Sequence, residues 1–419
     1  MALIYLLLFV SPQVLLYAYL RERLPDPARP ARAHLVRAGL AAVFAVFNFP
    51  WLFVARRVLL GSVWGMGRIP YLGPWIAWQM LGWILFGLVA VYVIAKAVVW
   101  LGKKVRRAPS TVRAPDTVIS RRRFLVRATY AYGAAGAAFS TYGIWNAERL
   151  PEVTRRTLTF PDLPPGLDGL RLLHLSDVHA GVHMEQDKMQ ALVAQANALG
   201  ADLIVQTGDM IDIDPAYIPH YVRAFRELSA PLGVVTVLGN HDRYTGADAV
   251  IRGVREAGQV FVRNDVHVIE RGGATLALVG IDDPRNWKAD DPQPLDIDLA
   301  LRRTPRDAFQ ILLAHRPGAF DGAAPRGIPL TLAGHIHGGQ FYLPILGWSA
   351  GRLITKYVMG HFRQGSSQLY VSRGIGVVGV PIRVFVPPEM ALIELRRSPP
   401  TQPRSPAARP DGSRSTPEP

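Results

Sequence analysis

Three long apolar segments without a charged residue lie within the first 100 residues of this 419-residue chain. They cover residues 3–20, 38–55 and 72–95. Each reaches the roughly 17–25 residues that a helix needs to cross the hydrocarbon core of a bilayer. A buried helix of a water-soluble domain rarely recurs three times at this length. The sequence therefore predicts three membrane-spanning helices.

A fourth apolar segment, residues 128–145, is richer in Ala, Gly, Ser and Thr. It follows residues 120–125 (SRRRFL), in which Arg121 and Arg122 resemble the twin-arginine export signal. Such signals normally begin a chain, so a fourth membrane helix flanked by Arg is an equal interpretation. No small-x-small cleavage motif follows the segment, which favours retention as an anchor. We expect residues 1–150 to form an all-α transmembrane region of about four helices.

The positive charge of the chain is concentrated in this N-terminal region. Residues 1–150 hold 19 of the 47 Lys and Arg but 4 of the 32 Asp and Glu, and this excess equals the formal net charge of +15. Basic loops between apolar segments are typical of membrane proteins, so we expect a bilayer and no nucleic acid as partner. The loops after the first and third segments are the most basic. If both are cytoplasmic, the chain after residue 146 lies outside the cytoplasm, at the cytoplasmic membrane.

The rest of the chain divides into a folded domain, residues 151–396, and a tail, residues 397–419. The tail is a mixture of Pro, Ser and Arg that we expect to be disordered. In the domain, short apolar runs of strand composition each end in Gly, Asp, Asn or His, and residues 188–199 between the first two runs have helical spacing. The runs are residues 170–175, 203–206, 234–238, 311–313 and 330–333. This order predicts an α/β core with a ligand site at the carboxyl ends of its strands.

The residues that follow these runs have the chemistry of metal ligands. The chain has no Cys, which excludes disulfides, Cys-ligated zinc and thiol catalysis. A hydrogen-bonded core His explains one polar residue at a strand end, but not four His, two Asp and one Asn in five segments. Such oxygen and nitrogen donors suit Mn, Fe, Zn or Co. The residues are Asp177, His179, Asp209, Asn240, His315, His335 and His337.

Two pairs of these donors are two residues apart, namely Asp177 with His179 and His335 with His337. In an extended backbone, side chains at positions i and i+2 share a face. We therefore expect each pair to offer two ligands to one metal from the end of one strand.

Five sequence blocks occur in a fixed order: Asp-x-His at 177–179, Gly-Asp-x-x-Asp at 208–212, Gly-Asn-His-Asp at 239–242, His315, and Gly-His-x-His at 334–337. Together they resemble the calcineurin-like metallophosphoesterase superfamily, in its bacterial membrane-anchored or twin-arginine-exported branch. The resemblance covers residues 170–337. It implies a four-layer α/β/β/α sandwich with two mixed sheets and the site at their rim.

Carried over to this sequence, the resemblance implies a catalytic site with two divalent ions, each Mn, Fe, Zn, Co or Ni. His241 would bind the phosphate or protonate the leaving oxygen, and Asp212 or Asp242 would orient neighbouring groups. The implied reaction is hydrolysis of a phosphoester by metal-activated hydroxide, without a covalent intermediate. One ion would be bound by Asp177, His179 and His337, and the second by Asn240, His315 and His335, with Asp209 bridging both.

The substrate is less constrained than the reaction. In the protein-phosphatase branch the second block continues into Arg-Gly and the third ends in Glu, whereas here the third ends in Asp242, so phosphoproteins are disfavoured. A lipid phosphoester near the bilayer and a soluble phosphodiester, phosphomonoester or pyrophosphate are equal alternatives. A second class of function is a membrane protein with a catalytically inactive, phosphoesterase-like binding domain. We favour the enzyme because no expected ligand is missing. The oligomeric state is not indicated by the sequence.

Overall fold

A computed structural model of the chain describes residues 13–14, 17–18, 21, 30–48, 138, 141–283, 294–379 and 381–398. Helix α2 (Pro30–Asn48) begins before the second apolar segment and includes Arg32 and Arg37. The segment at 72–95, most of the segments at 3–20 and 128–145, and nearly all of the tail lie outside the described residues. Among the helices of the described residues, none is long and apolar enough to cross a membrane.

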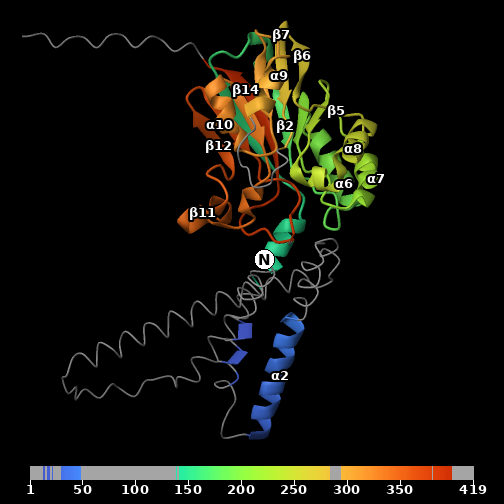
Figure 1. The fold of residues 1–419 in the computed structure, drawn as a ribbon, viewed down its shortest axis with the longest axis vertical. Helices are drawn as coiled ribbons and strands as arrows, with labels where there is room; N and C mark the ends of the chain where they lie inside the picture. The colour runs from blue at the N-terminus through green and yellow to red at the C-terminus, as the bar shows by residue number, and fades with distance from the viewer. Residues whose placement is uncertain are drawn as a thin grey trace, which may run out of the picture.

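The domain that follows contains two six-stranded mixed sheets (Figure 1). In the first sheet β2, β3, β4 and β5 are parallel to one another, and β14 is antiparallel to β2. In spatial order its strands are β1 (Glu152–Phe160), β14 (Glu389–Arg397), β2 (Arg171–Leu175), β3 (Leu203–Thr207), β4 (Val234–Val237) and β5 (Val260–Phe261). Since β2, β3 and β4 run the same way, the loops that follow them emerge at one edge of the sheet.

The second sheet has a similar plan. Strands β13, β9, β8 and β7 are parallel, while β12 and β6 pair antiparallel at the two edges. In spatial order its strands are β12 (Gly360–Gln364), β13 (Ser367–Val371), β9 (Leu330–Ala333), β8 (Phe309–Leu313), β7 (Ala274–Gly280) and β6 (Asp265–Arg271). A separate two-stranded ribbon joins β10 (Tyr342–Leu343) to β11 (Trp348–Ser349).

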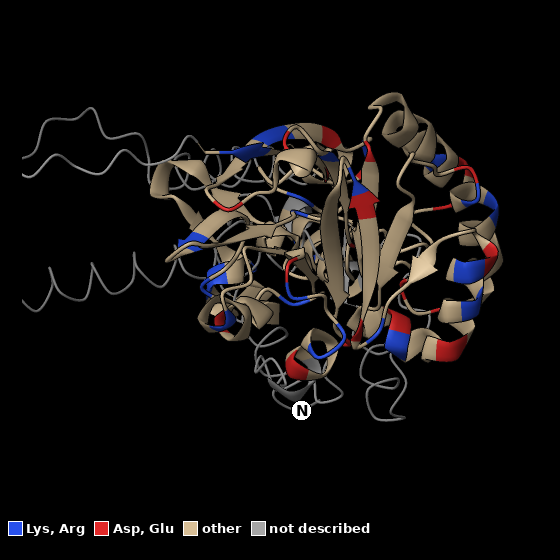
Figure 2. Cartoon of the chain, turned by 90° about the horizontal axis from the view of Figure 1, so that it is seen from above, with Lys and Arg blue, Asp and Glu red and all other residues tan. Residues whose placement is uncertain are grey.

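The alternation of apolar residues along the strands builds four layers. On β2, Leu172 packs between the two sheets, whereas Leu173 and Leu175 pack against the outer helices of the first sheet. On β8, Ile311 faces the other sheet and Leu312 faces the outer helices of the second sheet. The outer helices are α6 (Gln186–Ala198), α7 (Ile218–Phe225) and α8 (Asn240–Glu256) on one side, and α9 (Pro294–Leu301) and α10 (Ala319–Ala323) on the other. Charged residues lie mainly on these helices and on outer loops (Figure 2).

The local predictions for this domain are confirmed. The five apolar runs form β2, β3, β4, β8 and β9, and the segment of helical spacing lies largely in α6. The α/β fold with two mixed sheets is confirmed as well. The other strands of the two sheets were not predicted, namely β1, β5, β6, β7, β12, β13 and β14.

Candidate metal centre

The backbone at the candidate ligands is unusual. Five of the seven have a left-handed conformation, with φ of 56° at Asp177, 50° at His179, 55° at Asp209, 72° at His335 and 53° at His337. Residues other than Gly in such regions cost on the order of 1–3 kcal/mol each and cluster at functional sites. Hydrogen bonds fix these turns: the backbone N–H of Asp177 donates to the carbonyl of Gly208 at 3.0 Å, and that of His179 to the carbonyl of Asp209 at 2.9 Å.

We expected an extended backbone at two pairs of donors, Asp177 with His179 and His335 with His337. That prediction is wrong. β2 ends at Leu175 and β9 ends at Ala333, so both pairs lie beyond their strands, in turns. In left-handed turns, residues two apart do not share a face as they do in a strand. Asp177 and His179 still come together, but His335 and His337 join different groups of donor atoms.

The first group contains Asp177, His179 and His337, all of them buried. The Nε2 atoms of His179 and His337 are 3.2 Å apart. The same atom of His337 lies 3.3 Å from Oδ1 of Asp177. These residues come from the loops after β2 and β9, which belong to different sheets. The group therefore exists only where the rims of both sheets meet.

The second group surrounds Nε2 of His315. That atom lies 3.1 Å from Oδ1 of Asn240, 3.1 Å from Oδ2 of Asp209 and 3.1 Å from Nδ1 of His335. The other ring nitrogen of His315 donates to the carbonyl of Thr207 at 2.8 Å. In the neutral ring this bond leaves Nε2 as a lone-pair donor directed into the group.

The spacing of these atoms fits bound cations. Metal bonds of roughly 2.0–2.2 Å to nitrogen and oxygen place neighbouring ligand atoms about 2.8–3.6 Å apart at octahedral or tetrahedral angles. The separations around His315 and His337 fall in this range. A single ring N–H cannot donate to three atoms at once, so hydrogen bonding alone does not explain the environment of His315 Nε2.

Asp209 lies between the two groups. Its Oδ2 is 3.5 Å from Nε2 of His179 in the first group and 3.1 Å from Nε2 of His315 in the second. Its other oxygen accepts the backbone N–H of His241 at 2.8 Å, which fixes the orientation of the carboxylate. A buried carboxylate oxygen that contacts both groups is positioned to bridge two ions.

The carboxylates give this region a negative potential. Burial by itself disfavours a charged imidazole, yet the carboxylates of Asp209, Asp177 and Asp283 raise the pKa of His315 to about 10. Carboxylates that favour a positive charge on His315 also favour a bound cation in its place. His337 behaves differently, because there burial outweighs the charge of Asp177 and lowers its pKa to about 4.

His241 stands beside the donors and is held by Asp212. Its Nδ1 donates to the backbone carbonyl of Asp212 at 2.7 Å and lies 3.1 Å from the Asp212 carboxylate. That carboxylate is also 3.4 Å from Nδ1 of His179. Burial opposes protonation of His241, but the hydrogen bond to Asp212 and the charge of Asp209 raise its pKa to about 9. His179, Asp212 and His241 form a third group that has metal-binding chemistry.

Asp242 is fully buried and contacts the backbone next to the candidate ligands Asp209 and Asn240. One carboxylate oxygen accepts the backbone N–H groups of Asp209 and Gly239, and the other accepts that of Ile211. Burial and the nearby charge of Asp209 raise its pKa to about 7, although the backbone donors act in the opposite direction. Asp242 thus joins the loop after β3 to the first turn of α8.

Two glycines permit close packing around the carboxylates. A Cβ atom at Gly334 would collide with Ser176 and with the Asp177 carboxylate, and one at Gly239 would collide with the Asp209 carboxylate. Any side chain at either position would displace a donor.

One residue of this region was not predicted from the sequence. Arg383 is fully buried, and its Nη2 lies 3.2 Å from Nδ1 of His337. Its guanidinium also donates to the backbone carbonyls of Arg373, Gly374, Gly376 and Val386. The signal in the sequence is a single charge inside the apolar run Ile382 to Val386.

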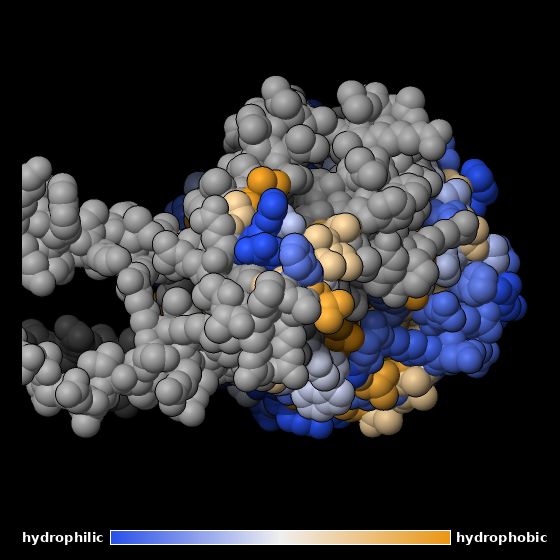
Figure 3. Space-filling model, turned by 90° about the horizontal axis from the view of Figure 1, so that it is seen from below, coloured by the Kyte–Doolittle hydropathy of each residue, from blue (hydrophilic) through white to orange (hydrophobic). Residues whose placement is uncertain are grey.

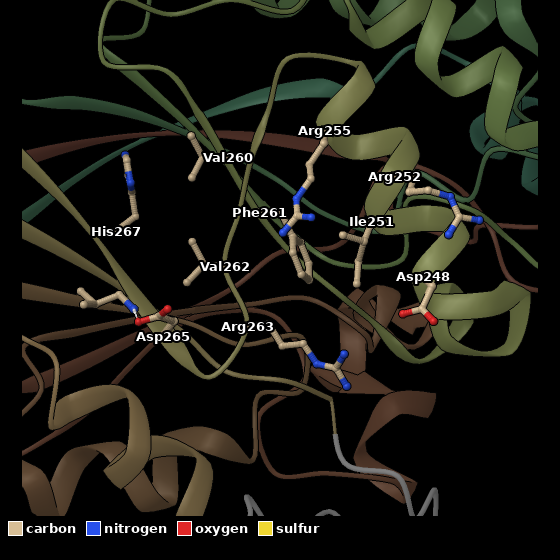
Figure 4. Close-up of a pocket in the computed structure, with 11 residues that line it drawn as sticks. Asp248, Ile251, Arg252, Arg255, Val260, Phe261, Val262, Arg263, Asp265 and His267 are labelled. Atoms are coloured by element: carbon tan, nitrogen blue, oxygen red, sulfur yellow. Dashed lines mark hydrogen bonds between the residues drawn. The ribbon is translucent and has the colours of Figure 1, made fainter.

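A cavity of about 530 Å³ lies apart from the donors (Figure 4). It is formed by the end of α8 and by residues around β5 and β6, with Arg252, Arg255 and Arg263 on its wall. None of the seven candidate ligands lines it. Arg255 lies over the ring of Phe261, 5.9 Å from its centre, and Arg263 pairs with Asp282.

Comparison with known proteins identifies the family. The calcineurin-like phosphoesterase family matches residues 170–339. Over 290 residues the chain is 31% identical to the uncharacterized metallophosphoesterase YkuE of Bacillus subtilis, an alignment that covers 66% of this chain and 98% of that protein. The chain belongs to the calcineurin-like phosphoesterase family. As a metallophosphoesterase, it is a metal-dependent hydrolase of phosphoric esters.

Two vertebrate relatives of this metallophosphoesterase are described as transmembrane proteins with a metallophosphoesterase domain. The one from Danio rerio is 31% identical over 271 residues, covering 62% of this chain and 61% of its own length. The one from Bos taurus is 28% identical over 365 residues, covering 83% of this chain and 80% of its own length.

Proposed function

We propose that this metallophosphoesterase binds two divalent ions and hydrolyses a phosphoester with a water-derived nucleophile. The observation that carries the proposal is the position of Asp209, whose Oδ2 contacts both groups of donors. Asp177, His179 and His337 would hold one ion. Asn240, His315 and His335 would hold the other, with Asp209 shared between them.

Two ions bound there would lower the pKa of water and offset the negative charge of the phosphoryl oxygens. The chain supplies the remaining functions. The backbone N–H of His241 holds one oxygen of Asp209, so the other is directed at both donor groups. Because Asp212 engages Nδ1 of His241, its Nε2 is the atom that can donate a proton to the leaving oxygen.

We also propose that residues 1–150 anchor the enzyme in the cytoplasmic membrane, with the domain outside the cytoplasm. Support comes from the apolar segments and from the excess of basic residues in the loops between them. The Bos taurus relative, described as a transmembrane protein, aligns over 83% of this chain, more than the folded domain alone provides.

The decisive experiment is metal analysis of the purified full chain, followed by hydrolysis assays. The chain, in detergent, is supplied in turn with Mn, Fe, Co, Ni or Zn and assayed on an aryl phosphodiester and an aryl phosphomonoester. We expect two ions per chain and hydrolysis of at least one ester. Fewer than two ions at saturation would refute the dinuclear centre. Two ions without hydrolysis of any ester would instead favour the catalytically inactive binding domain.

A further inference from the structure

Apolar side chains protrude from the segment that follows the loop carrying His335 and His337. This segment contains the short helices η6 (Pro344–Leu346) and η7 (Ala350–Leu353), separated by β11. Ile345 is 98% exposed and Leu353 is 80% exposed, and their neighbours Leu346 and Ile354 are exposed as well. Isolated exposed apolar residues are common, but four within ten residues mark an interaction surface.

An exposed aromatic residue, Trp145, lies at the same end of the domain. Residues 141–148 form a helix in which Trp145 is 57% exposed, and Figure 1 shows this helix and β11 at the same end. The helix and the ribbon of β10 and β11 are both hydrogen-bonded to the same segment, residues 383–384. The backbone N–H of Arg383 donates to the carbonyl of Gly143, and that of Tyr342 donates to the carbonyl of Val384. We call Trp145, Ile345, Leu346, Leu353 and Ile354 the apolar end.

Basic groups accompany the apolar end. Arg352 is exposed directly beside Leu353, and the guanidinium of Arg149 lies 5.4 Å from the centre of the Trp145 ring. The face seen from below is not uniformly hydrophilic, since apolar side chains interrupt the hydrophilic ones on its described part (Figure 3). Trp, Leu and Ile combined with Arg are typical of surfaces that enter the headgroup region of a bilayer.

We propose that the apolar end inserts into the interface of a bilayer that contains anionic lipids. The course of the chain supports a bilayer over a protein partner. Trp145 closes the apolar segment 128–145, so the sequence that enters the domain at this end is the one with membrane-anchor composition. The positive charge of Arg352 complements anionic headgroups.

The segment that carries most of the apolar end packs against the loop that follows the ligand His337. Ser349, between η6 and η7, donates from its Oγ to the carbonyl of Gly338 at 2.6 Å. A Cβ atom at Gly339 would collide with the backbone of Gly351. Gly338 and Gly339 immediately follow His337, so insertion of the apolar end would hold the loop of His335 and His337 close to the lipid headgroups.

This placement narrows the substrate to the phosphoester of a lipid headgroup, an inference that rests on the proposed function. In the reaction, the hydroxyl of water forms a bond to phosphorus. The bond between phosphorus and the ester oxygen breaks, and the leaving oxygen takes the proton. A soluble substrate would gain nothing from the apolar end, whereas a lipid would be presented to the centre without leaving its membrane.

The insertion itself can be measured without any assay of activity. Because the chain has no Cys, Ile345→Cys and Leu353→Cys each create a unique site for an environment-sensitive fluorophore. The full chain is reconstituted in phosphatidylcholine vesicles with phosphatidylglycerol and shallow nitroxide-labelled lipids. Val268→Cys on β6 is the matched control, because Val268 is apolar and 39% exposed, and Figure 1 labels β6 at the end of the domain opposite β11.

We expect several-fold stronger quenching by the labelled lipid at positions 345 and 353 than at position 268. Equal, weak quenching at all three would overturn the proposal. A fluorophore that reports an apolar environment but is not quenched by the labelled lipid would also overturn the proposal. In that case a second copy of the chain, or another part of the same chain, would cover the apolar end. Arg352→Glu should weaken quenching at position 353 with phosphatidylglycerol present, and Arg306→Glu, an exposed control, should not.

The substrate class is tested with the combined variant Ile345→Ser, Leu346→Ser, Leu353→Ser and Ile354→Ser. Loss of this apolar contact should lower hydrolysis of a vesicle-borne phospholipid by about tenfold or more and leave a soluble aryl phosphodiester unaffected. Equal losses on both substrates would contradict the lipid assignment. If the unaltered chain hydrolyses neither substrate, the proposed function fails, while the quenching result still decides whether the apolar end inserts.

Discussion

The carboxylate of Asp242 accepts the backbone N–H of Asp209 at 2.7 Å. The same oxygen accepts the N–H of Gly239, so one buried group fixes both the loop after β3 and the start of α8. Asp209 and Asn240, two of the candidate ligands, are carried by these two segments. Their relative position therefore depends on a side chain that binds no metal in our proposal.

Replacing Asp242 with Asn should loosen the centre. All three partners of this carboxylate are N–H donors, so the amide NH₂ would oppose at least one of them. We expect metal affinity to fall by about 10- to 100-fold, measured by competition with a chromogenic chelator. Asp248→Asn, further along α8, should leave the affinity unchanged. Unaltered affinity in Asp242→Asn would show that the backbone alone fixes the ligands.

Asp209 and His241 should have separable effects. Asp209→Ala removes the oxygen between the two donor groups and should reduce bound metal to one ion or none. His241→Ala keeps all seven ligands and should retain the metal while lowering kcat by about 10²- to 10⁴-fold. Elemental analysis and steady-state kinetics on one aryl phosphodiester give both values. Equal loss of metal in the two variants would remove the distinction.

The hydrogen bonds of the buried Arg383 side chain should stabilise the fold. Lys carries its donors on one nitrogen and cannot reach the backbone carbonyls that the guanidinium engages together. Arg383→Lys should lower the free energy of unfolding by about 1–3 kcal/mol, measured by denaturant titration of the full chain in detergent. Arg306→Lys, on the surface, should change it little. A similar small effect for both would mean that water replaces the missing donors.

His174 should contribute to acid sensitivity. Burial lowers its pKa to about 4, against the opposing charges of Glu389 and Asp177. The unfolded chain, with a His pKa of about 6.5, then binds a proton that the folded chain does not. Stability should therefore fall as the pH drops from about 6.5 to 4, by about 3 kcal/mol in total.

The variant His174→Gln isolates this contribution. It keeps an N–H donor for Thr207, which His174 contacts at 2.8 Å, but it does not titrate. The pH profile of the unfolding midpoint should be flatter in the variant than in the unaltered chain between pH 6.5 and 4. Parallel profiles would show that other groups cause the acid sensitivity.

The proposed topology can be tested with reporters fused after Pro419. A β-lactamase, which protects cells only from outside the cytoplasm, should confer resistance to ampicillin. A green fluorescent protein exported in the unfolded state should remain dark at the same position. The opposite pattern, fluorescence without resistance, would place the domain in the cytoplasm and contradict our assignment of the basic loops.

The sequence alone determined which residues have ligand chemistry and which five segments form the strands that lead to them. Apolar runs that end in Asp, Asn or His predicted β2, β3, β4, β8 and β9, because strand composition and the polar residues at strand ends are local properties. The order of the five blocks, a property of the sequence, also indicated the family. Arg383 was not predicted because a single charge inside an apolar run, its one local signal, does not by itself show that the side chain is buried beside the site.

Spacing along the sequence could not decide how the donors are grouped; the resemblance implied a grouping, and the tertiary structure gives its physical reason. Spacing placed His335 and His337 on one metal, whereas the structure puts them in different groups, because left-handed turns after β9 direct the two rings apart. The contacts of Asp209 with both groups likewise depend on two sheets meeting at one rim, and the register between sheets is set by packing of the whole core. The exposure of Ile345 and Leu353 is equally a tertiary property, since an apolar residue is buried or exposed only according to what the rest of the chain places over it.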